Sequence, residues 1–230
     1  MKKKFLICVI FYNEKKKMVK TINQLKAVKY DILFVNDGST DTNYNYLKKN
    51  KKNKVITHKL NSGYGSAVKT ASKYAKKKGY KFFGIFPGDN QRKITDLIKL
   101  FHLLENFSKK FAYISGSKFH LLKNIPLHRK FGNVFFSIIS KCWGNNTKDI
   151  LSGFKVYNTS LTYKIIQSAP DNYSFDLFVN LYANIMKKKH FEINVNCNYK
   201  NQSSKMNNLF LIFFHMIKTI FITLITKNAK

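Results

Sequence analysis

The chain of 230 residues is long enough to bury one sizeable core, and its 44% hydrophobic and 15% aromatic content is that of a folding chain rather than a disordered one. It carries 42 Lys+Arg against 11 Asp+Glu, a formal net charge of +31, which favours an anionic partner without separating nucleic acid, an anionic membrane and a phosphorylated substrate. Cys8, Cys142 and Cys197 are far apart and form no C-x-x-C pair, which argues against a zinc site or a disulfide framework.

Strand-like and helix-like segments alternate along the chain. The apolar run 5–11 leads into charged residues with no small-residue cleavage site, so we expect a strand there and not a signal peptide. Strands are predicted at about 5–11, 32–36, 55–58, 82–86, 112–116, 154–157 and 191–197. Helices are predicted near 15–28, 41–50, 65–78, 94–107, 131–142, 159–168 and 175–189. This order predicts an α/β fold with a mainly parallel central sheet flanked by helices.

The most informative motif follows the second predicted strand. The apolar run 32–35 ends in Asn36-Asp37-Gly38-Ser39-Thr40-Asp41, the pattern of a buried strand that breaks into a polar turn. Ligands of open α/β sheets bind at the carboxyl ends of strands, where Asp37 would point into the crevice. Gly38 would allow a sharp turn, and Ser39 or Asp41 could cap the next helix. A capped strand-to-helix turn without a ligand explains the same residues.

A glycine-containing segment opens the helix predicted near 65–78. In Asn61-Ser62-Gly63-Tyr64-Gly65, two glycines could let backbone N–H groups approach an anion at the helix N-terminus. The segment is neither a Walker loop nor G-x-G-x-x-G, so an ordinary helix entry is at least as good an explanation.

A carboxylate follows the strand predicted at 82–86. In Phe86-Pro87-Gly88-Asp89-Asn90-Gln91, the Asp89 carboxylate and the Gln91 amide oxygen suit a hard divalent cation that keeps positions open for substrate phosphates. The alternative is a plain Pro-Gly-Asp-Asn turn.

These motifs occur in a definite order with others. Tyr12-Asn13-Glu14 ends the first predicted strand, and further downstream come Ser115-Gly116-Ser117-Lys118, Asp149-Ile150-Leu151-Ser152-Gly153-Phe154-Lys155 and Ser204-Lys205. The ordered set resembles the family 2 glycosyltransferases of the GT-A fold, especially the dolichol-phosphate mannosyltransferase-like polyprenyl-phosphate glycosyltransferases. The resemblance covers roughly residues 5–205.

The resemblance implies a donor site for a UDP- or GDP-sugar. Glu14 and Asp37 would hold the base and ribose. The remaining implied nucleotide-binding residues are Tyr12, Asn13, Asn36, Asn61, Gly65 and Gly88. Asp89 and Gln91 would hold Mg²⁺ or Mn²⁺ against the diphosphate, which makes Asp89 one of two implied catalytic residues.

The resemblance also implies an acceptor side, with Asp149 as the second catalytic residue and Ser152 in the wall beside it. The candidates for binding phosphate are Arg129, Lys155 and Lys205, although isolated cations in so basic a chain also fit a surface role. A lipid-phosphate acceptor is already an anion, so Asp149 would position it rather than deprotonate it. A sugar hydroxyl acceptor would need Asp149 or Asp176 as a base. The family resemblance favours inversion at the anomeric centre.

Four positions depart from the family pattern. Ile10 stands where a proline is usual, and Asn36 replaces the first residue of an Asp-Asp pair. Pro87-Gly88-Asp89 replaces Asp-x-Asp, which leaves the metal one acid and Gln91. Lys200 stands near the position of an expected arginine before Ser204-Lys205 and lacks its bidentate fork. An inactive relative is therefore a live alternative.

The C-terminal part of the chain is predicted to differ from residues 1–206, which we expect to form the glycosyltransferase domain. Residues 207–230 contain an apolar run, 209–226, interrupted by His215 and Lys218. Its length approaches that of a spanning helix, but Lys218 near its middle argues against a simple span. The alternatives are a helix on an anionic membrane surface, a helix packed on the core, and a truncated anchor.

We therefore expect a metal-dependent, inverting glycosyltransferase, peripheral at the cytoplasmic membrane face, with a polyprenyl phosphate acceptor. One alternative is a family 2 enzyme that acts on a saccharide hydroxyl in surface-polysaccharide assembly, and another is a GT-A scaffold without turnover. A basic nucleic-acid-binding protein would explain the charge but not the carboxylates at the strand ends, so no specific nucleic acid is expected.

Overall fold

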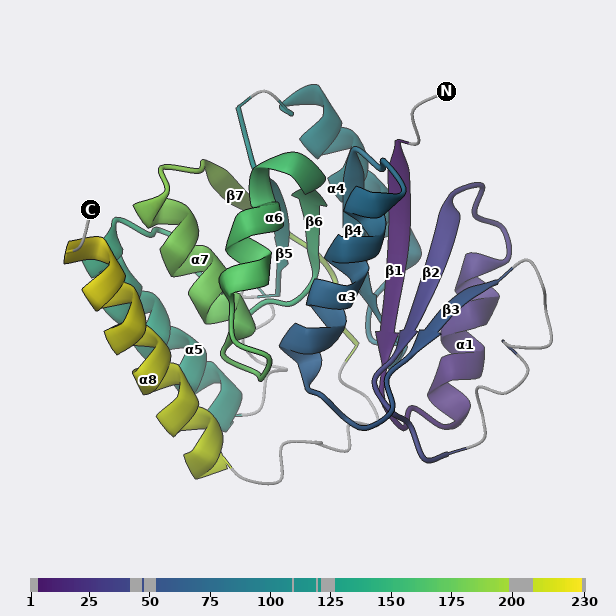
Figure 1. Cartoon of the computed structure of the whole chain (residues 1–230), viewed down its shortest axis with the longest axis horizontal. Coiled ribbons are helices and arrows are strands. Elements are labelled where there is room, and N and C mark those ends of the chain that lie inside the picture. The colour runs from purple at the N-terminus through teal and green to yellow at the C-terminus, as the bar shows by residue number, and fades with distance from the viewer. Residues whose placement is uncertain are drawn as a thin grey trace.

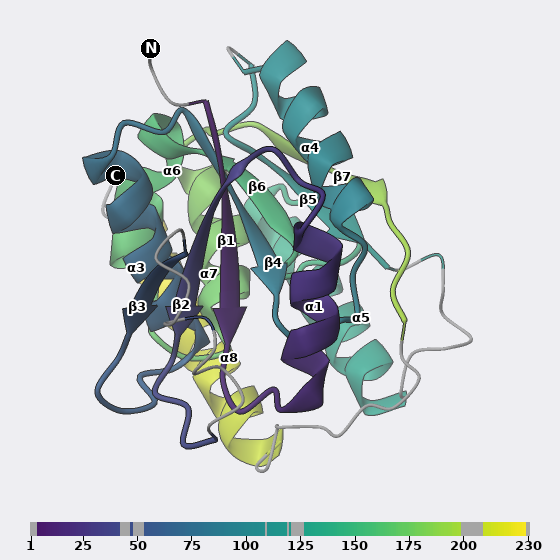
Figure 2. The same cartoon turned by 90° about the vertical axis from the view of Figure 1, so that its right-hand side faces the viewer.

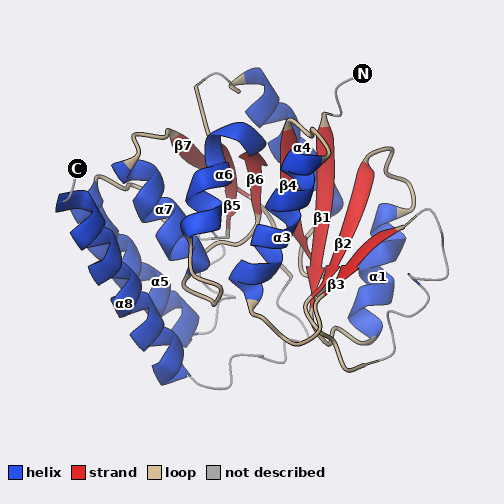
Figure 3. Cartoon of the chain, viewed as in Figure 1, coloured by secondary structure: helices blue, strands red, loops and turns tan. Residues whose placement is uncertain are grey.

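The computed structural model describes residues 4–41, 47, 53–108, 110–118, 120, 127–198 and 209–228 (Figures 1 and 3). The described strands are β1 (Phe5–Phe11), β2 (Asp31–Asn36), β3 (Lys54–Thr57), β4 (Phe82–Pro87), β5 (Tyr113–Ser117), β6 (Lys155–Asn158) and β7 (His190–Asn194). The described helices are α1 (Lys16–Leu25), α3 (Tyr64–Lys77), α4 (Ile94–Asn106), α5 (Leu127–Ser140), α6 (Thr159–Ser168), α7 (Phe175–Ile185) and α8 (Leu209–Asn228), and a short 3-10 helix spans Lys141–Trp143.

The strands form one sheet in the order β3-β2-β1-β4-β6-β5-β7. Neighbours β1, β2, β3 and β4 pair in parallel, as do β5 and β7, which confirms the prediction of a mainly parallel sheet. Strand β6 is antiparallel to both β4 and β5. The carboxyl ends of β1, β2 and β4 therefore meet at one edge of the sheet (Figure 2).

Helices cover both faces of the sheet, and the period of two along each strand divides the core between them. On β1, Leu6, Cys8 and Ile10 pack with α3, α6 and α7, whereas the alternate residues pack with α1 and α4. A third apolar cluster joins α5, α7 and α8, for example through Phe136 and Met216.

Every predicted strand is present and begins within one residue of its expected start. Helix α6 has its expected bounds, while α7 ends at Ile185 rather than 189 because the chain turns through a left-handed backbone at Lys187, where φ is 52°. Strand β7 likewise ends at Asn194 rather than 197. The helix predicted at 41–50 falls almost entirely outside the described residues, of which only Asp41 and the buried Leu47 belong to it.

Helix α8 lies beside α5 and α7 at one end of the molecule (Figure 1). Its inner residues Ile212, Met216 and Ile220 are buried, and Thr219 Oγ1 donates a hydrogen bond to Ser174 Oγ at the start of α7 (2.8 Å). Within the described chain, α8 included, we find no helix with the length and apolar character needed to cross a bilayer.

Two glycines with left-handed backbones form a matched pair for a stability test. Gly38 has φ +72° and Gly79 has φ +74°. A Cβ at Gly79 would have no heavy atom within 4 Å among its surroundings, whereas one at Gly38 would lie 2.4 Å from the carbonyl carbon of Leu60. We predict that Gly79→Ala lowers the free energy of unfolding in urea by about 1 kcal/mol, the cost of the left-handed backbone alone. Gly38→Ala is expected to lower it by clearly more, and equal losses would contradict the steric argument.

Candidate active site

A cavity of about 720 Å³ opens at the carboxyl ends of β1, β2 and β4. Eight of the residues expected at the site line it: Tyr12, Glu14, Asp37, Asn61, Gly88, Asp89, Gln91 and Asp149. The strand ends thus bring together residues that are up to 137 positions apart in the sequence (149 − 12).

Asp37 is held in place at both carboxylate oxygens. Oδ1 lies 2.8 Å from His58 Nδ1 and accepts a hydrogen bond from the Ser62 N–H (3.0 Å), and Oδ2 accepts one from the Gly63 N–H (3.0 Å). His58 is itself fixed by a contact of 2.9 Å between Nε2 and Thr70 Oγ1. A carboxylate has about four acceptor sites, so Asp37 retains capacity for a ligand hydroxyl or N–H.

Asn13 and Asn36 join two loops instead of lining the cavity. Asn13 Oδ1 accepts hydrogen bonds from the N–H groups of Thr40 (2.9 Å) and Asp41 (3.2 Å), and its own N–H donates to Ser39 Oγ (3.0 Å). Asn36 Oδ1 accepts from the Ser39 N–H (2.9 Å). These hydrogen bonds hold the loops that carry Tyr12, Glu14 and Asp37 at the cavity, and contact of Asn13 and Asn36 with a nucleotide stays a prediction.

The glycines at the start of α3 allow close packing against the backbone of residues 170–171, and the Gly63 N–H binds the Asp37 carboxylate. A Cβ at Gly65 would lie 2.2 Å from the carbonyl oxygen of Pro170, and one at Gly63 would lie 2.4 Å from that of Asp171. The Ser66 N–H donates to the same Asp171 oxygen (3.2 Å). Gly65 is buried and does not itself line the cavity, although Gly63 and Tyr64 do, which corrects its expected place in the floor.

The Asp89 loop is rigidly attached to β1 and α1. The Gly88 N–H donates to the Ile10 carbonyl (2.9 Å), Thr21 Oγ1 donates to the Gly88 carbonyl (2.9 Å), and a Cβ at position 88 would lie 2.6 Å from Phe11 Cβ. The Gln91 N–H donates to Asp89 Oδ1 (3.1 Å). Carboxylate and amide oxygens are the ligands that Mg²⁺ and Mn²⁺ take, and such ions usually keep positions open for phosphate oxygens. Asp89 and Gln91 fit that chemistry, although the described residues contain no cluster of three or more His, Cys, Asp or Glu.

Asp149 lines the cavity with a carboxylate that the protein orients. Oδ2 accepts a hydrogen bond from the Lys118 N–H (3.0 Å), and Oδ1 accepts one from Asn133 Nδ2 (2.8 Å). Asn133 on α5 in turn accepts from the Leu151 N–H (3.3 Å). The end of β5, the middle of α5 and the loop before β6 are thereby tied together at one carboxylate.

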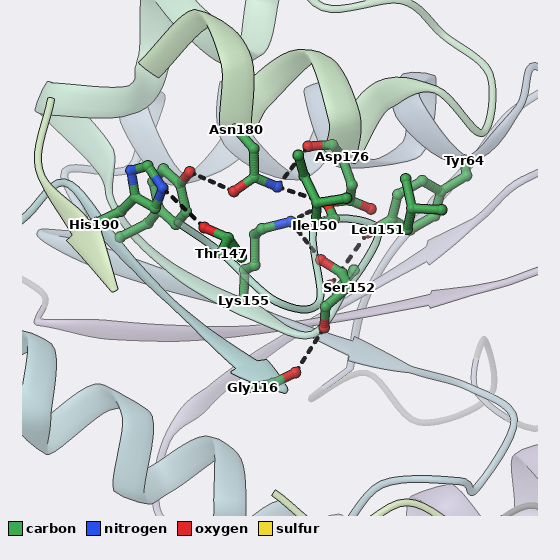
Figure 4. A network of polar contacts seen from close by, with 12 residues as sticks. Tyr64, Gly116, Thr147, Ile150, Leu151, Ser152, Lys155, Asp176, Asn180 and His190 are labelled. Atoms are coloured by element: carbon green, nitrogen blue, oxygen red, sulfur yellow. Dashed lines mark hydrogen bonds and ion pairs between the residues drawn. The ribbon is translucent and has the colours of Figure 1, made fainter. Parts of the chain in front are cut away.

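Lys155 and Ser152 are absent from the lining of the cavity and belong instead to a network of polar contacts with Asp176, Asn180 and Gly116 (Figure 4). Lys155 is fully buried, and its ammonium contacts Asp176 Oδ1 (2.5 Å) and donates to the carbonyl of Ser152. Burial raises the pKa of Asp176, and the Lys155 charge opposes that rise. Ser152 Oγ donates to the Gly116 carbonyl (2.7 Å). The phosphate-binding role expected of Lys155 is therefore corrected to that of a buried ion pair, and Ser152 anchors the loop to β5.

Three lysines that the motifs did not single out for binding line the cavity: Lys17 on α1, Lys118 after β5 and Lys130 on α5. Lys118 closes the Ser115-Gly116-Ser117-Lys118 motif, which was a usable signal. No motif in the sequence distinguishes Lys17 and Lys130 from the other cations of a chain with 42 Lys+Arg. The side chain of Arg129, and all of Lys205, lie outside the described residues.

An apolar wall completes the cavity on the side of Lys130. It is formed by Phe131, Phe136, Leu151, Ile212, Phe213 and Met216. Helices α5 and α8 meet there, with ring centroids of Phe136 and Phe213 separated by 5.5 Å. The cavity thus has a polar end with carboxylates at the strand ends and an amphiphilic end with lysines and aromatic rings.

Comparisons with known proteins agree with this geometry. The glycosyl transferase family 2 model matches residues 6–166. The UDP-N-acetylglucosamine–dolichyl-phosphate N-acetylglucosaminyltransferase of Methanococcus voltae is 32% identical over 170 residues, which cover 65% of this chain and 67% of that protein. An uncharacterised protein of Methanocaldococcus jannaschii is 33% identical over 135 residues, 56% of this chain and 57% of that protein.

Solved structures show the same fold at low identity. Glucosyl-3-phosphoglycerate synthase from Mycobacterium tuberculosis with phosphoglyceric acid superposes with a TM-score of 0.73 at 12% identity, covering 96% of this chain and 80% of that one. Its complex with Mn²⁺, UDP and phosphoglyceric acid gives a TM-score of 0.67 at 11% identity, covering 98% and 78%. The fold is that of the GT-A glycosyltransferases, and with the family model matched over residues 6–166 the chain belongs to glycosyl transferase family 2.

Proposed function

We propose that this family 2 glycosyltransferase moves a sugar from a UDP- or GDP-sugar to a polyprenyl phosphate, with inversion at the anomeric carbon. One observation carries the proposal: a single cavity joins the carboxylates at the strand ends to a pair of lysines and an apolar wall. The Methanococcus voltae relative, whose name includes a dolichyl-phosphate acceptor, supports the same assignment.

The polar end of the cavity suits the donor. Asp37, Glu14 and Tyr12 would contact the nucleoside, with Asn61 at the edge of the same pocket. Asp89 and Gln91 would hold Mg²⁺ or Mn²⁺, which when bound would neutralise the leaving diphosphate. Lys17 on α1 lines this cavity as well and adds positive charge for the diphosphate.

The amphiphilic end suits a lipid phosphate. Lys118 and Lys130 would bind the phosphate, and the wall that includes Phe131 and Phe213 would cover the first prenyl units. Burying apolar surface against such a wall is worth about 25 cal/mol per Å². A saccharide acceptor would gain little from it, so we rank a saccharide hydroxyl second.

The reaction needs orientation more than proton transfer. Positive charge develops at the anomeric carbon and negative charge on the diphosphate, and an acceptor phosphate oxygen is already an anion. Asp149 would then orient Lys118 and Asn133, with which it shares hydrogen bonds, rather than remove a proton. Asp176 lines the cavity too, but its Oδ1 is taken up by Lys155, which makes it a poor base for a hydroxyl acceptor.

A membrane-bound acceptor requires a surface that approaches the bilayer, and we assign that surface to α8 and α5. The outer side of α8 exposes Phe210 (81%), Phe214, Phe221 and Ile225 around the equally outward Lys218. α8 is apolar on its outer side as well as its inner side, so the exposed aromatic rings can enter the interfacial region of a bilayer, and the +31 charge favours anionic lipids. The inner side of α8 packs on the core at the same time, so a helix on a membrane surface and a helix packed on the core do not exclude each other. We propose a peripheral location at the cytoplasmic face.

The donor site predicts a metal-dependent thermal shift. At high salt, which suppresses nonspecific phosphate binding, either UDP or GDP should raise Tm in the presence of Mn²⁺ and not without it. Asp89→Asn should abolish the shift. Asp171→Asn, which changes a carboxylate 61% exposed and outside the cavity, should leave it unchanged.

The absence of any shift with both nucleotides would contradict an intact donor site and favour an inactive scaffold. Nucleotide binding without sugar transfer to any acceptor would favour the same scaffold. Transfer to a saccharide but not to a prenyl phosphate would favour an enzyme that acts on a saccharide hydroxyl.

The apolar wall predicts a selective effect on the acceptor. With a short, water-soluble prenyl phosphate, Phe213→Ala should raise KM for the acceptor about tenfold, or about 1.4 kcal/mol, because it removes part of the wall. Phe221→Ala on the outer side of the same helix serves as the matched control and should leave this KM unchanged. The Kd of the nucleotide should not change in either variant, and equal effects of both substitutions would contradict the assignment.

A further inference from the structure

A carboxylate on β7 grips the backbone on which Asp149 stands. Glu192 Oε1 accepts a hydrogen bond from the Lys148 N–H (2.8 Å), and Glu192 Oε2 accepts one from the N–H of Asp149 itself (3.0 Å). Both oxygens of one side chain are therefore committed to two successive amides of the loop before β6. A clamp of this kind fixes the direction of the chain at Asp149, and not merely its distance from β7.

The same pair of strands also reaches the Asp149 carboxylate. Strands β5 and β7 are parallel neighbours, with Ser115 opposite Glu192 and Ser117 opposite Asn194. Lys118, the residue that follows the end of β5, donates its N–H to Asp149 Oδ2. The backbone of Asp149 is thus set by β7 and its side chain by the end of β5, two elements whose relative position the sheet hydrogen bonds fix.

A second residue of β7, His190, contacts the same loop at Thr147, the residue before Lys148. His190 lies two positions before Glu192, on the same face of the strand, and its Nε2 is 3.3 Å from Thr147 Oγ1. Burial lowers the pKa of His190 to about 4, so the ring is neutral near pH 7. Nδ1 is directed to the Lys188 carbonyl (3.3 Å), so Nε2 is the acceptor of a hydrogen bond from the Thr147 hydroxyl. The imidazole ring also stacks on Tyr113, with the ring centroids 4.6 Å apart.

Glu192 is partly buried where it binds the loop. Burial raises the pKa of its carboxyl, and the two backbone N–H groups oppose that rise. The chain has only 11 acidic residues, and this one binds the backbone of a loop.

We propose that Glu192 is a positioning residue of the transfer reaction: it sets the backbone at Lys148–Asp149 and thereby holds Asp149 against Lys118 and Asn133 on the acceptor side. The inference rests on the proposed acceptor-side role of Asp149. It assigns Glu192 no contact with substrate, so its effect should fall on turnover and not on nucleotide binding.

The first arm of the test needs no activity. Amide hydrogen exchange of the full chain is compared for wild type, Glu192→Ala and Glu192→Gln. We expect exchange at the Lys148 and Asp149 amides to rise at least tenfold in Glu192→Ala, while the strand amides of Tyr113–Ser117 keep their protection. Glu192→Gln should be intermediate, because its carbonyl oxygen still accepts one N–H while its NH₂ group opposes the other. Unchanged exchange at both amides in Glu192→Ala would overturn the proposal.

The second arm measures transfer from UDP-N-acetylglucosamine, or from a sugar of whichever nucleotide shifts Tm, to a short prenyl phosphate. Glu192→Ala should lower kcat at least tenfold and leave the nucleotide Kd within twofold, with Glu192→Gln between it and wild type. Glu105→Ala is the control and should leave kcat unchanged, because it removes a carboxylate on α4 that is paired with Lys4.

The two arms separate this inference from the proposed function. A wild-type protein that transfers no sugar to the prenyl phosphate contradicts the proposed function, while the exchange arm still decides whether Glu192 holds the loop. An active wild type with raised exchange but unchanged kcat in Glu192→Ala would overturn the positioning role. Should Glu192→Ala fail to fold, Glu192→Gln is judged by the same criteria, a partial rise in exchange and a partial fall in kcat.

Discussion

The position of Asp149 in the cavity depends on the reversed direction of a single strand. Parallel strands place their carboxyl ends at one edge of a sheet, and only an antiparallel strand can place its beginning there. Strand β6 runs antiparallel between β4 and β5, with Val156 opposite Gly84 and Lys155 opposite Ser115. The loop that precedes it, with Asp149 and Gly153, therefore arrives at the edge where β1, β2 and β4 end. A parallel β6 would carry that loop to the opposite edge, away from Asp37 and Asp89.

Bringing this loop to the edge of the sheet buries polar backbone, and a network of polar side chains satisfies it. Asn180 Nδ2 donates to the Ile150 carbonyl (2.7 Å), Tyr64 OH donates to the Gly153 carbonyl (3.2 Å), and Lys155 serves the Ser152 carbonyl. The Lys155 charge is in turn balanced by Asp176. Removing one partner of such a buried pair typically costs about 3–5 kcal/mol, because the other charge stays buried without compensation. The loop is thus a rigid part of the fold, which suits a site that works by orientation.

Much of this arrangement was predictable, because apolar runs locate the strands and parallel strands align their ends. Asp37 and Asp89 line one cavity for that reason, whereas Asp149 reaches it through the loop before the antiparallel strand β6. The roles of Asn13 and Lys155 were not predictable from local pattern. An amide after a strand can face a ligand or the next loop, and Asn13 binds the next loop. The partner of Lys155 lies 21 residues away on a helix whose packing no local signal reveals. The apolar wall from α8 required the position of the C-terminal helix, which depends on burial against α5 and α7 rather than on any motif.

Two of the departures from the family pattern have different consequences once each residue is placed. Asn36 is buried outside the cavity, and its side chain accepts a hydrogen bond from the Ser39 N–H, so an amide in place of a carboxylate there removes no charge from the polar end of the cavity. Asp37 supplies that charge with both oxygens oriented. Pro87 does line the cavity, beside Gly88. A proline in place of the family's first acid therefore leaves Asp89 as the one carboxylate of that loop. Gly88 is packed against Phe11, so position 88 has no room for a larger, acidic side chain. If a cation binds there, the phosphates of a bound nucleotide would add charge compensation, which would couple metal binding to nucleotide binding.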